Sequence, residues 1–278
     1  MQIRWVISIL ATLLIVGCVA HQVNQTSLSY LHKARLPKIE NYAVYYGSDK
    51  IDELSKFDLV ILDPDNYSKD EIEKLKKNGT IVLAYLSLGE VNENRWYFEY
   101  AKKCIIGRNP TWGSYYINIS CKTWKSLLLG KIIPKILEKG FDGLFLDTVD
   151  VVDNYPQFKD DMIDLIKSIR AEYPNIILIQ NRGFSVIDET AKYVNGVLFE
   201  CFTTHYNWSS GKYELWSCND LNWVNEMALK LLKLRDKYDL IILALDYADN
   251  EYLKEKCIEH AKKFGFVPYV TTVDLTSV

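Results

Sequence analysis

The chain has 278 residues, of which 49% are hydrophobic and 25% charged, and its formal net charge is -3 at pH 7. This length and apolar content suffice for one large domain, or two small ones, with a sizeable core. The absence of a basic excess argues against a nucleic-acid-binding protein, and no long run of like charges indicates a disordered tail.

The first 20 residues differ from the rest of the chain. A short positive start at Arg4 is followed by an almost wholly apolar run over residues 5–16 and then by small residues. This layout predicts a secretory signal peptide, because the apolar run is shorter than the about 20 residues that a membrane-spanning helix needs. The segment also resembles a lipoprotein leader with Cys18 as the lipidated residue, and an uncleaved anchor is a third alternative. We therefore expect an extracellular or cell-surface protein, with a polar linker over residues 21–38.

Export affects the interpretation of the cysteines, because disulfides persist in oxidising compartments. Cys104 and Cys121 are 17 residues apart, and so are Cys201 and Cys218. Each pair brackets an irregular segment, so the spacing is compatible with two loop-closing disulfides, although spacing alone does not fix the connectivity. Cys257 lies at helical spacing with apolar neighbours and is expected to be a buried thiol.

Eight short apolar runs follow, and amphipathic stretches lie between them. The continuous, β-branched-rich character of these runs is typical of strands buried on both faces, as in parallel sheets. Such strand–helix units predict an α/β fold, the (β/α)8 or TIM barrel, as a single domain over residues 39–278. An open doubly wound sheet is the alternative, but no GxGxxG motif follows the first run. The predicted strands are residues 42–47, 58–65, 80–90, 141–150, 175–183, 194–202, 240–249 and 266–275.

Two connections are long, residues 90–120 and residues 203–220. Connections of this length are usually functional or disordered. Their aromatic residues and paired cysteines favour ordered structure.

Carboxylates follow nearly every predicted strand, on the side that forms the active-site face of a (β/α)8 barrel. An Asp after a strand often caps the next helix, which is the simpler explanation for Asp65 and Asp150. Capping is a poor explanation for Asp147 and Glu200, because they directly follow the apolar runs GLFL and GVLF and should be partly desolvated. Burying a charge costs stability, which favours a functional role for both residues. Two carboxylates across a pocket can perform glycoside hydrolysis, although many barrels place acids here for metals. The acids are Asp63, Asp65, Glu90, Asp147, Asp150, Glu200, Asp246, Asp249 and Asp274.

Six motifs over residues 41–275 together resemble glycoside hydrolase family 114, the endo-α-1,4-polygalactosaminidases and their relatives. They are YYG, DLVILDPDNYS, GTIVLAYLSLGEV, GFDGLFLDTVD, QNRGF and VNGVLFE. The resemblance implies a (β/α)8 barrel with a catalytic pair at the ends of the fourth and sixth strands. Here the pair is Asp147, which the family suggests as the nucleophile, and Glu200 as the acid/base, with the order of roles less firmly fixed than the pair.

The resemblance also implies a substrate groove and a substrate. Polar positions expected to line the groove are Asp63, Tyr85, Glu90, Asn181 and Asp246, together with Tyr45 and Asp150. The family's substrate is a cationic galactosamine polymer, so an α-linked amino-sugar polysaccharide is the expected partner, with no cofactor and no metal. The predicted acids fit this independently, because a carboxylate-lined cleft attracts protonated amino sugars.

Other side chains near the predicted groove have two interpretations each. Arg95 and Arg182 can form structural salt bridges, pair with the catalytic acids or bind an anionic sugar group. Aromatic side chains on the two long connections can stack on sugar faces or pack their own loop. These are Trp96, Tyr97, Trp112, Tyr115, Tyr206, Trp208 and Trp216.

Three other classes of protein compete with a glycosidase. A zinc hydrolase is disfavoured because the four histidines form neither HxH nor HExxH, whereas Ca²⁺ or Mg²⁺ on Asp63 and Asp65 stays open. A non-catalytic extracellular glycan-binding protein on a TIM barrel is also open, although the carboxylate pair argues against it. A phosphate enzyme is disfavoured because the last two strand ends carry acids and no glycine. The sequence does not decide between retention and inversion at the anomeric carbon.

Overall fold

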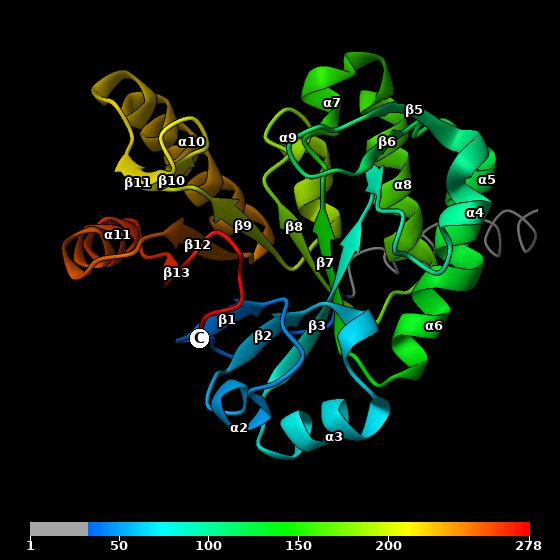
Figure 1. Cartoon of the computed structure of the whole chain (residues 1–278), viewed down its shortest axis with the longest axis horizontal. Helices are drawn as coiled ribbons and strands as arrows, with labels where there is room; N and C mark the ends of the chain where they lie inside the picture. Colours follow the sequence, from blue (N-terminus) through cyan, green and yellow to red (C-terminus); the bar gives the residue numbers. More distant parts are fainter. Residues whose placement is uncertain (1–32) are drawn as a thin grey trace, which may run out of the picture.

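The computed structural model describes residues 33–278 and forms a (β/α)8 barrel (Figure 1). Eight parallel strands make one sheet in the order β1-β2-β3-β7-β8-β9-β12-β13. The predicted leader, residues 1–20 with Cys18, and most of the predicted linker 21–38 lie outside the described residues. Within residues 33–278, no helix is long and apolar enough to cross a membrane.

All eight predicted strands are confirmed, each shorter than the apolar run that contains it. β13 and β1 complete the barrel by packing rather than by a ladder of hydrogen bonds. The Tyr46 N–H donates to the carbonyl of Leu275 at 2.8 Å, and the rings of Tyr42 and Tyr269 lie 5.5 Å apart. The barrel strands are β1 (Tyr42–Tyr45), β2 (Leu59–Leu62), β3 (Ile81–Ser87), β7 (Gly143–Asp147), β8 (Ile177–Asn181), β9 (Gly196–Glu200), β12 (Ile241–Tyr247) and β13 (Val267–Thr271).

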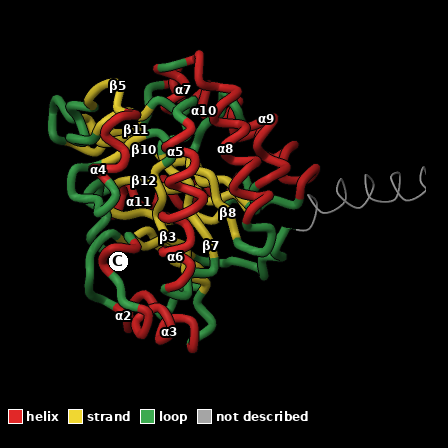
Figure 2. Tube along the Cα trace, turned by 90° about the vertical axis from the view of Figure 1, so that its right-hand side faces the viewer, coloured by secondary structure: helices red, strands yellow, loops and turns green. Residues whose placement is uncertain are grey.

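Helices surround the strands on the outside (Figure 2). Ser68 precedes the first turn of α3 (Lys69–Lys77), where its side chain and that of Glu71 cap each other's backbone N–H groups. Pro134 is the second residue of its helix, directly after a π-helical turn over Leu128–Ile132. The main helices are α2 (Ile51–Leu54), α3 (Lys69–Lys77), α5 (Lys122–Leu127), α6 (Ile133–Glu138), α8 (Lys159–Glu172), α10 (Cys218–Tyr238) and α11 (Glu251–Lys263), with short α7 (Val151–Asn154) and α9 (Ile187–Thr190). Residues 272–278, after β13, form no helix, so the expected eighth strand–helix unit is incomplete in the described chain.

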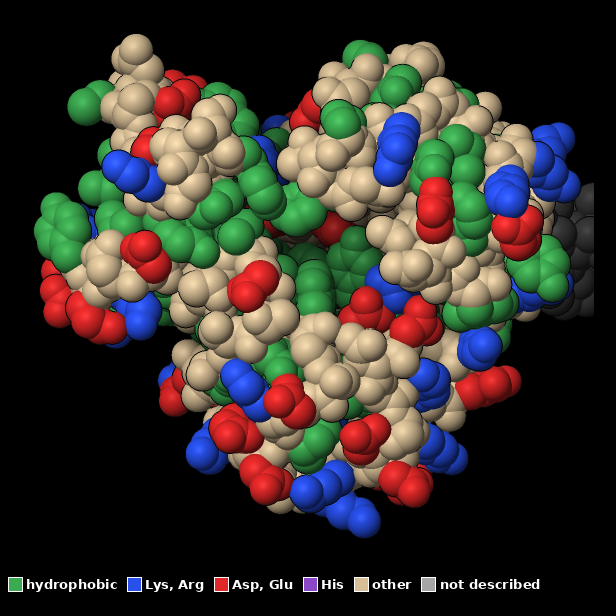
Figure 3. All heavy atoms as spheres, viewed as in Figure 1, with side chains coloured by type: hydrophobic (Ala, Val, Ile, Leu, Met, Phe, Trp, Pro, Cys, Tyr) green, Lys and Arg blue, Asp and Glu red, His purple; other side chains and the backbone are tan. Residues whose placement is uncertain are grey.

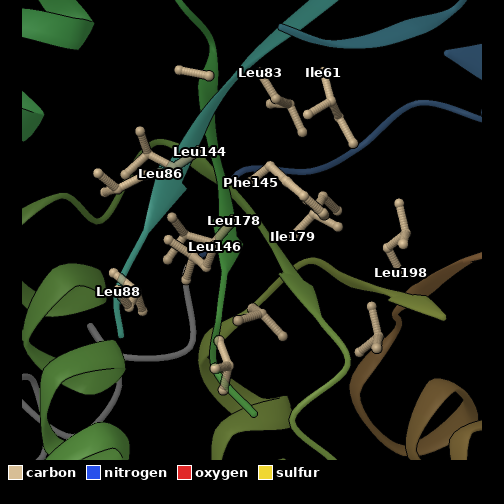
Figure 4. Close-up of a cluster of buried hydrophobic side chains, with 14 of the residues drawn as sticks. Ile61, Leu83, Leu86, Leu88, Leu144, Phe145, Leu146, Leu178, Ile179 and Leu198 are labelled. Carbon is tan, nitrogen blue, oxygen red and sulfur yellow. The ribbon is translucent and has the colours of Figure 1, made fainter. Parts of the chain in front are cut away.

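Tight packing of β7 against its neighbours brings its acidic end into the barrel. Side chains of a strand alternate between its two faces, so Phe145 and Asp147 share the inner face, where the ring of Phe145 lies 6.5 Å from that of Tyr85. On the other face of β7, Leu144 and Leu146 lie near Leu86 of β3 and Leu178 of β8 (Figure 4). A Cβ atom at Gly143 would lie 1.9 Å from the backbone oxygen of Ile177, so only glycine permits this approach of β7 to β8.

The two long connections are ordered and contain small antiparallel sheets, which the sequence patterns did not predict. We call residues 90–120 the first insertion and residues 203–217 the second insertion. The first contains β4 (Glu90–Val91), β5 (Ile105–Arg108), β6 (Tyr115–Ile117) and α4 (Phe98–Ala101), and the second contains the hairpin β10 (Thr204–Asn207) and β11 (Lys212–Leu215).

Only one of the two expected disulfides is present among the described residues. Cys104 and Cys121 are bonded, with their Cα atoms 5.9 Å apart, and the Asn118 N–H also donates to the Cys104 carbonyl at 2.8 Å. The predicted second pair is wrong: Cys201 and Cys218 are free. Cys201 is partly exposed as a residue, but burial of its thiol raises the pKa of this group well above its ordinary value. Cys218 is exposed and is the first residue of α10.

Alkylation of the unfolded, non-reduced protein tests this connectivity. We expect modification of Cys201, Cys218 and Cys257 but not of Cys104 and Cys121, as read by peptide mass mapping. A peptide that links Cys201 to Cys218 would contradict the structure.

Loss of the native bond through Cys104→Ser should lower the unfolding free energy by up to about 3 kcal/mol, because the bond closes a loop of about 17 residues. The matched control Cys218→Ser should cost almost nothing.

Candidate active site

The centre of the candidate site is formed by the last residues of three adjacent strands. Asp147 ends β7, Asn181 ends β8 and Glu200 ends β9. The Asn181 side-chain Nδ2 donates to Asp147 Oδ1 and to Glu200 Oε2, with 2.8 Å in each case. The two acceptor oxygens are therefore no more than about 5.6 Å apart, twice the length of one bond. The face of the molecule shown in Figure 3 has a central hollow with acidic side chains at its floor.

The backbone turns sharply after each of these three residues. Thr148, Arg182 and Cys201 all adopt left-handed conformations, with φ of 56°, 44° and 56°. Such a conformation costs a non-glycine residue about 1 kcal/mol or more, and it persists where the surrounding structure fixes it. Here the N–H groups of Arg182 and Cys201 donate to the carbonyls of Leu198 and Leu245, on the adjacent strands. Strain is thus concentrated directly after the three side chains of the candidate site.

Three tyrosines surround the carboxylates. The Tyr247 hydroxyl donates to Glu200 Oε1 at 2.6 Å, and the rings of Tyr46 and Tyr85 lie 5.1 Å apart. Burial raises the pKa of all three phenols well above the ordinary value, and the next cause is the charge of Asp147 or Glu200. The phenols therefore stay protonated over the ordinary pH range and serve as hydrogen-bond donors.

The environment of Asp147 favours its protonated form. Burial raises the pKa of this carboxyl to about 6, and the negative charge of Glu200 is the second cause. The hydrogen bond from Asn181 acts in the opposite direction, since it stabilises the ionised form. Asp147 is consequently ionised for the most part at pH 7 but takes up a proton in mildly acidic solution.

Arg95 neutralises the acids at the end of β2. Its Nη1 and Nη2 lie 2.7 and 2.8 Å from the two carboxylate oxygens of Asp63, and Nη1 lies 2.9 Å from Asp65 Oδ2. The guanidinium also lies over the ring of Tyr85, 5.6 Å from its centroid. Asp63 and Tyr85 thus share the guanidinium of Arg95, and the carboxylate of Asp63 is already paired within the protein.

Two more predicted acids, Glu90 and Asp150, have different neighbours. Glu90 accepts hydrogen bonds from Asn109 Nδ2, at 3.1 Å, and from the Ser114 hydroxyl, so it holds the first insertion together. Burial raises the pKa of the Asp150 carboxyl, the charge of Arg182 lowers it, and the charge of Glu200 raises it further. The Arg182 Nε is 3.9 Å from Asp150 Oδ2.

Two predicted groove residues, Tyr45 and Asp246, face away from the pair. The Tyr45 hydroxyl donates to Asp49, and Asp246, which is 1% exposed, accepts the N–H groups of Thr203 and Thr204 at 2.6 and 2.9 Å. The next residue of each chain segment, Tyr46 and Tyr247, faces the carboxylates instead. Because strand side chains alternate, an error of one residue selects the wrong face. The register could have revealed Tyr247, since Leu245 pairs with Glu200 and Tyr247 is two residues further along.

The donor groups at this site do not suggest a metal centre. Within residues 33–278, no three His, Cys, Asp or Glu side chains gather as metal ligands would. Asp63 and Asp65, which the sequence left open for Ca²⁺ or Mg²⁺, both bind Arg95.

A TIM barrel with two carboxylates at its strand ends is an arrangement found in glycoside hydrolases. The family model described as Glycoside-hydrolase family GH114 matches residues 24–278. The chain therefore belongs to this family of glycoside hydrolases, as the motifs implied.

Relatives and solved structures agree with this assignment. An uncharacterised protein of Methanocaldococcus jannaschii is 31% identical over 264 residues, which cover 81% of this chain and 73% of that protein. The glycoside hydrolase domain of PelA from Pseudomonas aeruginosa superposes with a TM-score of 0.76 at 24% identity, covering 87% of this chain and 98% of that chain. Aspergillus fumigatus Ega3, solved in complex with galactosamine, superposes with a TM-score of 0.65 at 15% identity, covering 87% and 95%. At these identities the superpositions establish the fold.

The raised pKa of Asp147 predicts how its replacement affects stability. The folded-state pKa is about 6 and the ordinary value is 3.8, so the folded protein binds this proton more tightly than the unfolded chain does. Stability should therefore fall as the pH rises from about 4 to about 6. Asp147→Asn has no carboxyl group at this position, so it does not lose stability in this way. The unfolding free energy of the variant minus that of the wild type should therefore be larger at pH 7 than at pH 4, by roughly 1–3 kcal/mol.

Urea denaturation at both pH values measures this change. Asp249→Asn, at an exposed position, is the control and should show no such increase. A difference between Asp147→Asn and the wild type that does not vary with pH would refute the prediction.

Proposed function

We propose that the protein is an exported, endo-acting glycosidase that cleaves an α-linked, galactosamine-containing polysaccharide with Asp147 and Glu200. The observation that carries this proposal is the side-chain amide of Asn181, which donates to both carboxylates at 2.8 Å. It supports a functional pair because two neighbouring, partly buried carboxylates repel each other and have no structural reason to be held together.

The proposed mechanism retains the configuration at the anomeric carbon. Asp147 attacks this carbon while Glu200 protonates the departing glycosidic oxygen. Glu200 then removes a proton from the water that hydrolyses the resulting glycosyl–enzyme ester. Retaining glycosidases hold their two carboxyl groups about 5–5.5 Å apart and inverting ones about 6.5–9.5 Å apart. The limit of about 5.6 Å between the bridged oxygens therefore favours retention.

The substrate proposal depends on the charge that is left in the cleft. Asp63, Glu90 and Asp246 are engaged by other groups of the protein, so the cleft is less acidic than the sequence suggested. Asp147, Asp150 and Glu200 are the carboxylates that can attract a protonated amino sugar. The similarity to Ega3, which was solved with galactosamine, supports the same class of sugar.

Export is supported by the leader pattern and by the disulfide between Cys104 and Cys121, since such bonds persist in oxidising compartments. A polysaccharide too large to enter a cell would require this location. We propose secretion, with a lipid tether at Cys18 as the alternative form of export.

Product release from partly de-N-acetylated α-1,4-polygalactosamine, followed by mass spectrometry, tests the activity. The wild type should release oligosaccharides, and Asp147→Asn and Glu200→Gln should each lower the rate at least about 10³-fold without loss of folding. NMR of the first products should show the α anomer if configuration is retained. Binding of the polymer without any products would instead favour the glycan-binding protein, and substantial activity in either variant would exclude the assigned pair.

The pH profile tests the role of Asn181. In the wild type, kcat/KM should decline below about pH 6, because Asp147 must be ionised to attack. Asn181→Ala removes a hydrogen bond that favours the ionised carboxylate, so this limb should move to higher pH, together with a fall in kcat of roughly 10²-fold.

A conservative comparison distinguishes positioning from general damage to the fold. Asn181→Gln keeps the amide, and it should restore part of the wild-type pH profile if the amide can reach both carboxylates. An unchanged acidic limb in Asn181→Ala would show that the amide does not control the ionisation of Asp147.

A further inference from the structure

The two insertions touch each other through a pair of exposed tryptophans. Trp112 lies between β5 and β6 of the first insertion, and Trp208 lies at the turn of the β10–β11 hairpin in the second. Their ring centroids are 5.2 Å apart and their planes meet at 87°, an edge-to-face contact. The side chains nevertheless remain 55% and 56% exposed. Each indole therefore presents much of its apolar surface to solvent.

The position of this contact follows from the order of the barrel strands. The first insertion begins after β3 and the second after β9, and β7 and β8 lie between these two strands in the sheet. Both insertions leave the C-terminal ends of their strands, the end at which Asp147, Asn181 and Glu200 emerge. In Figure 1 the loop between β5 and β6 reaches across this end of the barrel toward the β10–β11 hairpin. The tryptophan pair thus belongs to the two insertions that leave the barrel at the end where the candidate active site opens.

Both tryptophans are carried by well-fixed turns. In the first insertion, the side-chain oxygen of Asn109 accepts the Thr111 N–H at 3.1 Å. The backbone carbonyl of Asn109 accepts the Gly113 N–H at 2.9 Å. In the second insertion, the carbonyl of Asn207 accepts the Gly211 N–H at 2.8 Å. The ring of Tyr206 also lies 4.9 Å from that of Trp208. The two indoles are therefore positioned in advance, which limits the entropy lost when a ligand binds.

Packing explains other aromatic side chains of the insertions better than it explains this pair. Trp216 stacks on His205 with centroids 4.1 Å apart, and its indole N–H donates to the Cys201 carbonyl at 2.7 Å. Tyr97 is buried against Trp124. Trp112 and Trp208 have no comparable buried partner among the described aromatic contacts. Exposed apolar clusters of this kind commonly mark a binding surface.

We propose that Trp112 and Trp208 form a subsite that binds pyranose rings of the polysaccharide at a distance from the bond that is cleaved. This inference rests on the proposed function and adds a second contact region to it. The flat apolar face of an indole complements the C–H face of a pyranose, and the indole N–H can donate to a sugar hydroxyl. A subsite at the mouth would favour long chains over short ones, because only a chain of several sugars reaches both the carboxylates and the tryptophans. Binding energy from such remote groups raises the specificity for the polymer.

Binding of graded oligosaccharides by inactive protein tests the subsite without requiring cleavage. In the Asp147→Asn background, calorimetry with de-N-acetylated α-1,4-galactosamine oligomers compares disaccharides with chains of six or more sugars. Trp112→Ala and Trp208→Ala should each weaken binding of the long chains about tenfold and leave disaccharide binding unchanged. The Trp→Phe variants should lose less, because a smaller aromatic face remains. Tyr252→Ala, which removes an exposed aromatic ring from α11, is the matched control and should have no effect.

The double variant adds a second criterion. If the indoles act as one subsite, Trp112→Ala with Trp208→Ala should weaken binding by less than the product of the two separate factors. Long-chain affinity that is unchanged from the Asp147→Asn parent in both single variants would overturn the subsite, and so would the absence of any oligosaccharide binding. Neither result would affect the proposed function if the wild type still releases products from the polymer. Length-dependent binding through the tryptophans, without any cleavage by the wild type, would support the subsite on a glycan-binding protein.

Discussion

The hydrogen bonds from Asn181 to Asp147 and Glu200 are the constraint on which the rest of the site depends. They require β7, β8 and β9 to end at the same level, so that one short amide can reach both carboxylates. Glycine at Gly143 allows β7 to approach β8 closely enough. The left-handed residues that follow each strand then direct the chain away from the barrel axis. A single neutral donor thus links the packing of three strands to the electrostatics of the pair.

The residues proposed for chemistry and those proposed for recognition lie on different parts of the fold. The barrel strands supply the carboxylates, the amide and the tyrosines, all on short, buried segments. The insertions supply the exposed aromatic surface and are held by their own contacts, including the disulfide and the hydrogen bonds of Glu90. Glu90 illustrates the division, because it was expected to contact substrate and instead holds the first insertion in shape. If these proposals hold, a change in an insertion alters recognition with little effect on Asp147 and Glu200.

The sequence predicted the barrel strands and the carboxylate pair because apolar runs that end in an acid are visible without knowledge of the fold. It failed where the answer depends on which face of a strand a residue occupies. Runs buried on both faces show no alternation, so Tyr45 and Asp246 could not be distinguished from Tyr46 and Tyr247. The cysteine spacing failed for a related reason. Cys104 and Cys121 bracket strands whose ends meet, whereas the chain runs from the second hairpin into α10 and takes Cys218 to the surface. The spacing of residues in the sequence shows neither the face of a strand on which a side chain lies nor the path of the chain between two cysteines.

The left-handed backbone at Cys201 has a consequence for engineering. A residue with a Cβ atom is strained at φ of 56°, whereas glycine adopts this conformation without strain. Position 201 is thus a place where the durability of the protein could be improved without altering Asp147, Asn181 or Glu200.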